Sequence, residues 1–462
     1  MTLNNQNNLF SEIELKQELL QGLEDLNYVK MTDVQKQSIP YILEKKDVIV
    51  EAQTGSGKTA AFGLGLLNQL DVKVFRLQSL ILCPTRELAD QVANELRKLA
   101  KKIHNVKILT ICGGMPYGPQ ISSLKHGAHV IVGTPGRVHD HLLKERINFS
   151  SIKNFILDEA DRMLEMGFKD TIDDLIEKLP DGRQNLLFSA TYPKEISQIS
   201  NHIMKEPILI KVKPPSSKTN ITQKFYKVKN DEDKIPLISS LLSTHKPESC
   251  IIFCNTKKRV KQLEELIKKE SFITKSLHGD LEQKDRNQVL VQFLNKSVTV
   301  LIATDVAARG IDVNNLDLVV NFDLPFDSSV YTHRIGRTGR AGNNGLACSL
   351  ISDNDLQKII FLEDLLGITI DLLESDFSKF YVYKPKFNTI QINAGKKQKI
   401  RAGDILGALT NHPDINGEDI GLINIFDNTS YVAIKLSKSN KAVKKITTDK
   451  LKGRSFRARL IR

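Results

Sequence analysis

The chain lacks tryptophan and has only five cysteines in 462 residues. The cysteines form no CxxC pair and have no histidine at zinc-finger spacing, and most lie in apolar runs. This pattern disfavours a zinc or redox centre and favours reduced, packed thiols. No apolar run approaches the roughly 18 residues that a membrane span needs. The polar start MTLNNQNNLF does not resemble a signal peptide, so we expect a cytoplasmic protein without a membrane partner.

Acidic residues are scarce at one end of the chain. The formal net charge is +12, and residues 385–462 hold 16 of the 66 Lys and Arg but only 6 of the 54 Asp and Glu. The remainder of the chain is therefore close to neutral. A run of basic residues can simply be a solvated face of a domain. So strong a local surplus of positive charge instead favours an anionic partner, and nucleic acid is the leading candidate.

Apolar, β-branched runs alternate with helical stretches over most of the length, which predicts an α/β fold with parallel sheets. Within each run, apolar and polar residues do not alternate, as expected of strands that are covered on both faces of the sheet. We expect strands in the first part at 47–52, 79–85, 106–112, 129–134, 154–159 and 185–191, and in the second part at 249–255, 273–279, 299–305, 317–323 and 345–351.

The tail has the order βαββαβ, which is the ferredoxin-like split unit of RNA-recognition modules. The expected strands are 388–394, 420–427, 430–436 and 455–462, and the helices are 401–411 and 438–449. The predicted organisation is a first domain at 1–210, a linker at 211–220, a second domain at 221–375, a linker at 376–387 and a basic domain at 388–462.

A phosphate-binding loop is predicted at AQTGSGKT, residues 52–59, between a strand and a helix. The segment fits the P-loop pattern except that Ala52 replaces the first glycine. The candidate ATP-binding residues are Ala52, Gln53, Thr54, Gly55, Ser56, Gly57, Lys58 and Thr59. Backbone N–H groups would cradle the phosphates, Lys58 would add a charge, and Thr59 would ligate Mg²⁺.

Two acidic residues end the predicted strand at 154–159, where open α/β sheets carry their ligands. Asp158 is suited to hold Mg²⁺ and Glu159 to orient or deprotonate the attacking water. Alone, such a pair is commonly only a helix cap. The P-loop one hundred residues earlier favours the catalytic interpretation.

The second domain has no P-loop but contains HRIGRTGR, residues 333–340. Arg334, Arg337 and Arg340 recur every three residues, which places them on one side of a helical or turn-like segment. A lobe that is rich in arginine and lacks a phosphate loop suggests that ATP is shared between two domains, with arginine fingers assisting hydrolysis.

Together these residues resemble the DEAD-box RNA helicases over about residues 10–370, with the literal DEAD at 158–161. The resemblance implies two tandem RecA-like domains and a nucleotide pocket in which Gln35 reads adenine while Tyr28 and Phe10 supply aromatic contacts. Asn27 and Met31 stand where the family usually has glycine and proline.

The family's RNA-gripping and coupling motifs appear in order. The resemblance implies RNA contacts by Pro84, Thr85, Arg86, Gly114, Thr134, Arg137, Asn255, Gln283, Arg286 and Thr304. It implies that Ser189 and Thr191 couple hydrolysis to RNA, that Asp312 binds the ribose of ATP, that Arg337 and Arg340 contact the γ-phosphate, and that His333 links to the DEAD segment.

The tail is similar to the C-terminal RNA-binding domain of DbpA-type DEAD-box helicases, mainly through residues 392–409. That resemblance implies recognition of large-subunit ribosomal RNA during ribosome assembly. Lys396, Lys397, Lys399 and Arg401 form the densest basic cluster and are the candidates for phosphate contact. A second basic cluster, at 454–459, is either a second RNA contact or a solvated edge strand whose charges resist aggregation.

The sequence therefore predicts a monomeric, ATP- and Mg²⁺-dependent RNA helicase that is tethered to ribosomal RNA through its tail. Three alternatives stay open at this point. One is a general RNA chaperone with a nonspecific basic anchor, the second is an ATP-gated RNA clamp without catalysis, and the third is a DNA helicase.

Overall fold

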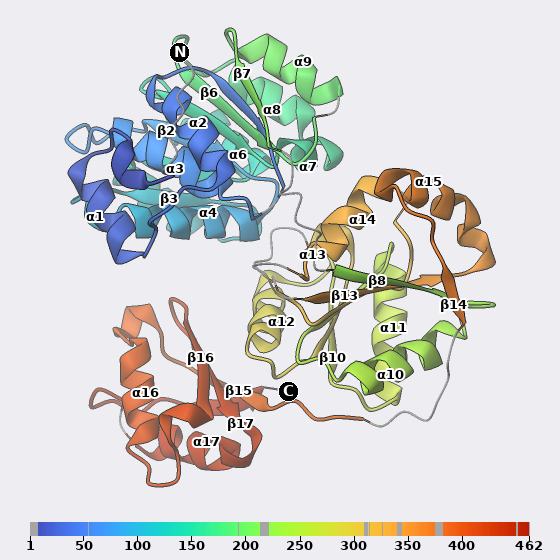
Figure 1. Cartoon of the computed structure of the whole chain (residues 1–462). Coiled ribbons are helices and arrows are strands. Elements are labelled where there is room, and N and C mark those ends of the chain that lie inside the picture. Colours follow the sequence, from blue (N-terminus) through green and yellow to red (C-terminus); the bar gives the residue numbers. More distant parts are fainter. Residues whose placement is uncertain are drawn as a thin grey trace. The chain divides into compact units, whose positions relative to one another are not determined.

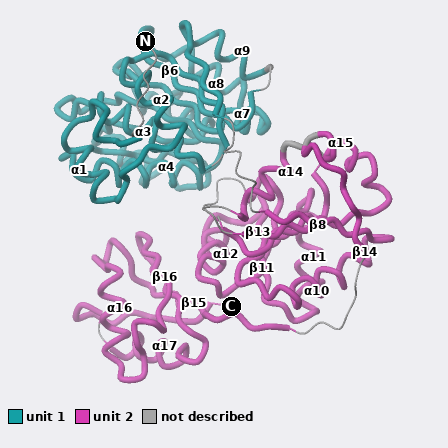
Figure 2. The backbone as a smooth tube through the Cα atoms, viewed as in Figure 1, with its two compact units in different colours: residues 1–217, 309–312 teal, residues 218–308, 313–462 magenta. Residues whose placement is uncertain are grey.

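The computed structural model describes residues 8–461, apart from 54, 193, 213–220, 309–312, 314, 326, 340–343, 375–381 and 450. The chain divides into two compact units, which Figure 2 shows in different colours. The first unit contains the described residues up to 212, and we call it the first lobe. The second unit contains the second lobe, residues 221–374, and the C-terminal domain, residues 387–461.

The first lobe is built on a parallel sheet of seven strands in the order β3-β4-β2-β5-β6-β1-β7 (Figure 1). The strands are β1 Val48–Glu51, β2 Ser79–Leu82, β3 Ile108–Ile111, β4 Val130–Gly133, β5 Asn154–Asp158, β6 Gln184–Ser189 and β7 Ile208–Lys211. The helices are α1 Gln17–Asp25, α2 Asp33–Leu43, α3 Lys58–Gln69, α4 Arg86–Leu99, α5 Tyr117–Lys125, α6 Pro135–Leu143, α7 Ala160–Glu165, α8 Lys169–Ile176 and α9 Lys194–Ile203.

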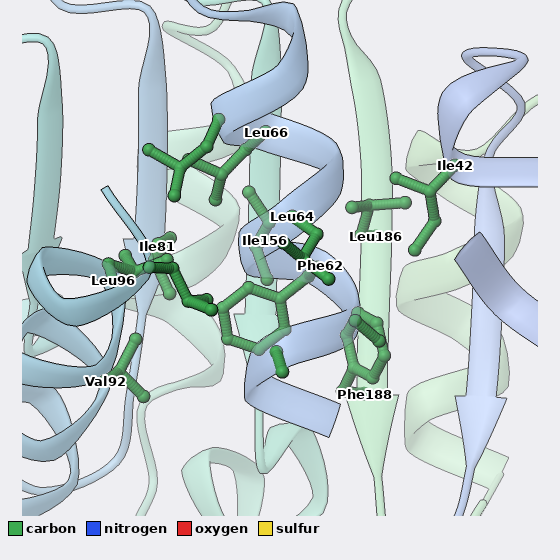
Figure 3. Packing of buried hydrophobic residues seen from close by; sticks show 14 of the residues in the cluster. Ile42, Phe62, Leu64, Leu66, Ile81, Val92, Leu96, Ile156, Leu186 and Phe188 are labelled. Carbon is green, nitrogen blue, oxygen red and sulfur yellow. The ribbon is translucent and has the colours of Figure 1, made fainter. Parts of the chain in front are cut away.

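Helices cover both faces of this sheet, as the continuous apolar strands predict. Val48 and Val50 of β1 pack with α1 to α4, whereas Ile49 between them packs with α6 to α9 on the other face. Figure 3 shows the first of these cores, in which the rings of Phe62 and Phe188 lie 5.1 Å apart. This packing fixes the strand ends from which the functional loops start.

The second lobe repeats the plan, with strand order β10-β11-β9-β12-β13-β8-β14. The strands are β8 Ile221–Lys227, β9 Cys250–Phe253, β10 Thr274–Leu277, β11 Val300–Ala303, β12 Leu318–Asn321, β13 Gly345–Ile351 and β14 Leu372–Glu374. The helices are α10 Lys234–His245, α11 Lys257–Lys269, α12 Gln283–Leu294, α13 Asp305–Ala308, α14 Ser328–Ile335 and α15 Leu356–Leu366. Every pair in this sheet is parallel.

The C-terminal domain has an antiparallel sheet of four strands in the order β16-β17-β15-β18. Its elements are β15 Phe387–Ile392, α16 Ala402–Thr410, β16 Ile420–Ile425, β17 Ser430–Lys435, α17 Ser439–Thr448 and β18 Ala458–Ile461. The βαββαβ order confirms the RRM-like prediction. Both helices pack on one face of the sheet through one apolar cluster.

The opposite face of that sheet contacts α12 of the second lobe. Tyr431 and Ile461 form an apolar cluster with Val291. Asn295 donates from Nδ2 to the Thr389 hydroxyl oxygen at 3.2 Å, and that hydroxyl lies 2.7 Å from the Ser297 hydroxyl. The aromatic Tyr431 is therefore 5% exposed and is committed to packing rather than to base stacking.

The predicted fold class, two tandem RecA-like parallel-sheet domains plus a small α+β domain, is confirmed. The expected strands all exist, with ends that differ by a few residues. Three strands were missed: β7, β8 and β14. β7 is a short run after Pro207, β8 interleaves polar and charged residues, and β14 has three residues, so none shows a long apolar pattern.

The five cysteines are free and buried, as predicted. Burial raises the pKa of the Cys112 and Cys348 thiols to about 12, so these thiols remain protonated and weakly nucleophilic near neutral pH. Among the described residues, no helix combines the length and apolar character that crossing a membrane would need.

Candidate nucleotide and RNA site

The P-loop connects β1 to the N-terminus of α3, as the sequence predicts. Gly55 and Gly57 have φ values of 84° and 90°, which favour glycine, and Gly57 is the N-cap of α3. The arrangement directs backbone N–H groups of the helix terminus toward the loop, where they form an anion site. Thr54, another predicted ATP contact, lies outside the described residues.

Lys58 is 7% exposed, and its ammonium donates to the carbonyl oxygen of Ala52 at 2.6 Å. The loop itself is tied to β6, because the Ala52 N–H donates to the Ser189 carbonyl at 3.0 Å. Ser56 donates from its hydroxyl to the Gln53 carbonyl at 2.7 Å. Hydrogen bonds inside the P-loop and to β6 therefore fix the loop's conformation. The Lys58 ammonium lies beside the backbone of this loop.

The segment proposed to read adenine is attached to the same loop. Thr32 and Gln35 form a capping box at the start of α2. Gln35 Nε2 also donates to the Gly57 carbonyl at 3.2 Å, and the Thr32 hydroxyl donates to the Ser56 carbonyl at 2.8 Å. A Cβ on Gly57 would lie 2.5 Å from Gln35 Nε2, so a side chain there would push the two segments apart.

The two aromatic residues predicted beside adenine have different surroundings. Tyr28 is 38% exposed, and its hydroxyl donates to Glu95 at 3.0 Å, which leaves the ring accessible. Phe10 is 3% exposed and belongs to the apolar core. The structure therefore gives Phe10 a packing role, and its contact with adenine stays a prediction.

The DEAD segment begins at the carboxyl end of β5. Asp158 is 3% exposed, and burial raises the pKa of its carboxyl to about 7, although the neighbouring Lys58 lowers this pKa. Glu159 follows with φ at 53°, an uncommon conformation for a residue other than glycine, and it is less buried than Asp158. The turn between β5 and α7 thus separates two adjacent carboxylates into a buried one and a more accessible one.

Asp161 joins this turn to the coupling segment, a role that the sequence reasoning missed. Its carboxylate accepts from the hydroxyl of Thr191 at 2.9 Å and from the Thr191 N–H at 3.1 Å. The Asp161 N–H donates to the Ser189 hydroxyl oxygen at 3.3 Å. Because Ser189 also accepts from Ala52, hydrogen bonds connect the P-loop, the DEAD turn and the SAT segment in series.

The raised pKa of Asp158 makes a prediction about stability. A carboxyl with a folded-state pKa near 7 and an ordinary unfolded pKa near 4 destabilises the fold as pH rises between these values. We expect Asp158→Asn to raise the unfolding temperature of the nucleotide-free first lobe by roughly 10 °C at pH 8 and hardly at all at pH 4. Calorimetric scans across pH would test this. The exposed Asp170→Asn serves as the control, and an equal shift at both pH values would contradict the assignment.

The residues predicted to hold RNA in the first lobe are brought together around β3, α4 and α6. Thr85 caps α4 by accepting from the Leu88 N–H at 3.3 Å, and Thr134 accepts from the Gly113 N–H at 3.2 Å. Arg137 donates to the Met115 carbonyl at 2.8 Å, and its guanidinium lies 4.0 Å from the centre of the Tyr117 ring. Pro84 lies in the loop between β2 and α4, and Gly114 lies in the loop between β3 and α5.

In the second lobe, Arg334, which its spacing groups with Arg337 and Arg340, is buried and hydrogen-bonded within the lobe. It is 1% exposed and donates to both carboxylate oxygens of Asp305 at 2.6 and 2.7 Å. It also donates to Asn255 Oδ1 at 2.8 Å, while Asn255 Nδ2 donates to the Leu324 carbonyl at 2.8 Å. Both ends of the Asn255 amide are therefore used inside the lobe, and its contact with RNA stays a prediction.

The other second-lobe candidates lie at the carboxyl end of β11 and on α12 and α14. The Thr304 hydroxyl accepts from the Ala307 N–H at 3.4 Å, and Arg286 donates to the Ala307 carbonyl at 2.7 Å. Gln283 donates to Asn287 at 2.9 Å. His333 belongs to α14 and Arg337 follows that helix. Asp312 and Arg340 lie outside the described residues.

The basic cluster of the C-terminal domain surrounds a short turn before α16. Lys396, Lys397, Lys399 and Arg401 are all exposed. Gly395 allows this turn to approach the loop after β16 closely, since a Cβ there would lie 2.1 Å from the Phe426 carbonyl oxygen. The N–H of Lys396 donates to that same carbonyl at 2.9 Å. The four basic side chains are thus exposed around one short turn that is hydrogen-bonded to the loop after β16.

The two lobes, the P-loop and the DEAD turn define a helicase-type nucleoside triphosphatase, and comparison with known families agrees. The DEAD/DEAH box helicase family matches residues 32–199, the helicase conserved C-terminal domain matches 233–342, and the DbpA RNA binding domain matches 389–460. The chain is 48% identical over 444 residues to the ATP-dependent RNA helicase DbpA of Escherichia coli, covering 96% of this chain and 97% of the relative.

A second relative, the ATP-dependent RNA helicase DbpA of Bacillus subtilis, is 37% identical over 472 residues, covering 97% of this chain and 98% of the relative. Among solved structures, S. cerevisiae Dbp5 bound to RNA and ADP BeF3 matches with a TM-score of 0.72 and 33% identity, covering 80% of this chain and 96% of that one. The chain belongs to the DbpA family of DEAD-box ATP-dependent RNA helicases. It is an RNA-dependent ATPase and RNA helicase.

Proposed function

We propose that this helicase acts on large-subunit ribosomal RNA during ribosome assembly, as a monomer in the cytoplasm, and that its C-terminal domain holds it there while the lobes unwind short duplexes nearby. The observation that supports this proposal is the turn at which Lys396, Lys397, Lys399 and Arg401 are exposed, in a region that matches the DbpA RNA binding domain. A tether of this kind raises the local concentration of substrate RNA, to roughly millimolar for short linkers.

We also propose that Mg²⁺ accompanies ATP. Asp158, buried at the strand end, and Thr59, in the first turn of α3, fit an ion that keeps several waters and shares phosphate oxygens. Among the described residues, no three His, Cys, Asp or Glu side chains form a dedicated metal cage, which agrees with such a shared site. The ion would neutralise phosphate charge, while Arg337 and Arg340 are proposed to act on the γ-phosphate.

The tether is best tested by charge substitution, because deleting the domain would expose Val291 and its neighbours on α12. We expect replacement of Lys396, Lys397 and Lys399 by Gln to remove the preference of the ATPase for ribosomal RNA over bulk RNA. Each lost phosphate contact should also reduce the slope of the logarithm of the RNA-binding constant against the logarithm of the salt concentration by about one. Stimulation of the ATPase by each RNA is the measurement.

The matched control replaces Lys438, Lys441 and Lys444 of the α17 region by Gln, which removes the same charge elsewhere on the domain. If both triple variants lose the preference equally, the tail is a nonspecific basic anchor. If the native chain shows no preference for ribosomal RNA, the tethering proposal is wrong, although the helicase activity would stand.

A further inference from the structure

A groove of about 560 Å³ lies between α10 and α11 of the second lobe, two helices that Figure 1 shows as neighbours. One apolar cluster holds both helices on the same face of the sheet. None of the predicted ATP or RNA contacts that the structure describes lines this groove. Its chemistry is therefore separate from the nucleotide and RNA sites described above.

One end of the groove is formed by Phe322, which follows β12 and is 3% exposed. The Lys234 ammonium and the Arg259 guanidinium each lie 5.0 Å from the centre of this ring. Asp231 forms ion pairs with both cations, at 3.0 Å with Lys234 and closely with Arg259. Because these charges are already paired with one another, a ligand at this end meets an apolar ring in a preformed setting.

α11 turns one face toward the groove. The residues on this face recur at intervals of three and four, and they are Arg259, Gln262, Leu263, Leu266 and Lys269. From the first to the last they span about 15 Å along the helix. Leu263 is buried, whereas Leu266 is 40% exposed, and Ile235 of α10 also lines the groove. An exposed leucine beside buried apolar residues favours a ligand with an apolar surface.

The unpaired charges at the rim indicate the sign of that ligand. Glu232 and Glu265 are exposed, and within the described part of the chain neither carboxylate has a hydrogen-bond or ion-pair partner. Carboxylates at the mouth repel the phosphates of a nucleic acid and attract lysine or arginine. Lys269, which lies at the other end of the α11 face, would instead meet a carboxylate.

We propose that this groove binds a short amphipathic helix of a partner protein. Its apolar side chains would pack on Leu266 and Phe322, and its lysine or arginine side chains would meet Glu232 and Glu265. In the helix-in-groove mode of recognition, apolar anchors recur at positions i, i+3 or i+4, and i+7. Such anchors span about 10 Å, which fits within the length of the α11 face.

The probe is a library of random 16-residue peptides displayed on phage and selected against the full chain without RNA. The net charge of +12 disfavours nonspecific capture of basic peptides, so their enrichment would be informative. We expect the enriched peptides to share apolar residues at helical spacing with flanking lysine or arginine. Leu266→Glu should weaken their binding by roughly tenfold, whereas Leu356→Glu, at a 54% exposed leucine of α15, should leave it unchanged.

A charge exchange tests the rim. Glu232→Lys together with Glu265→Lys should weaken binding of a basic peptide by roughly tenfold, and a peptide with glutamate in place of its lysines should bind this variant better than the native chain. The matched control, Asp364→Lys with Asp371→Lys, makes the same change of charge at exposed positions elsewhere on the lobe and should preserve the native preference.

Three results would overturn the proposal. The first is the absence of any enriched sequence pattern, and the second is enrichment only of peptides that bind Leu266→Glu as tightly as the native chain. The third is a native dimer that Leu266→Glu dissociates in sedimentation experiments, because the groove would then belong to a second copy of this chain.

Discussion

Glu159→Gln should retain the binding of ATP and of RNA and should lower RNA-stimulated turnover by roughly 10²- to 10⁴-fold. The substitution keeps the size and shape of the side chain but removes a carboxylate that can orient or accept a proton from the attacking water. The structure supports this division of roles, because the buried Asp158 is suited to the ion and the more accessible Glu159 to the water.

The experiment measures phosphate release at saturating RNA and, separately, the dissociation constant of a fluorescent ATP analogue. Asp170→Asn, an exposed carboxylate on α8, is the matched control and should stay within about twofold of the native rate. Turnover within threefold of native in Glu159→Gln would refute the assignment. Loss of nucleotide binding together with turnover would show that Glu159 acts on the shape of the turn.

Replacing Arg334 should destabilise the second lobe strongly. Its guanidinium makes five hydrogen bonds to Asp305, Asn255, Asn321 and the Asp323 carbonyl, and it lies 5.1 Å from the centre of the Phe253 ring. Arg334→Met would leave the Asp305 carboxylate and the amide oxygens of Asn255 and Asn321 without this donor. Breaking a buried pair in this way costs about 3–5 kcal/mol.

Hydrogen exchange of the amides in β9 and β12 is the suitable measurement, because a chain of several domains does not unfold in one step. We expect Arg334→Met to lower the opening free energy of these strands by that amount, and Arg334→Lys to rescue only part, since an ammonium cannot reproduce the planar fork. Lys258→Met removes an exposed charge from α11 and should change exchange by less than about 0.5 kcal/mol. Native-like exchange in Arg334→Met, with turnover lost, would contradict this structural role and indicate that Arg334 acts directly in hydrolysis.

Much of the fold was predictable from local pattern. Apolar, β-branched runs such as 154–158 form covered parallel strands because both faces of the sheet are buried, and their continuous apolar character is visible without any tertiary information. The strands β7, β8 and β14 were not predicted, because segments that are short or that mix apolar with polar residues form strands only through pairing with neighbouring strands.

The candidate site was predictable in part. The P-loop and the DEAD turn were found because their chemistry is carried by contiguous residues whose types and spacing are specific. Asp161 and Asp305 were missed because their function depends on partners 30 and 29 residues away in the chain. The burial of Arg334 was not predicted, because spacing along a helix shows which residues share a side but does not show which side is buried.

The sequence by itself determined the family, the two-lobe plan, the nucleotide-binding loop and the placement of excess positive charge at the tail, because each depends on residues close together in the chain. The tertiary structure alone decided that Arg334 is buried within its lobe and that Tyr431 is covered by α12. It also decided how the P-loop is joined to the DEAD turn and the SAT segment. These features arise from hydrogen bonds and packing between residues far apart in sequence, whose energies depend on burial that no local pattern specifies.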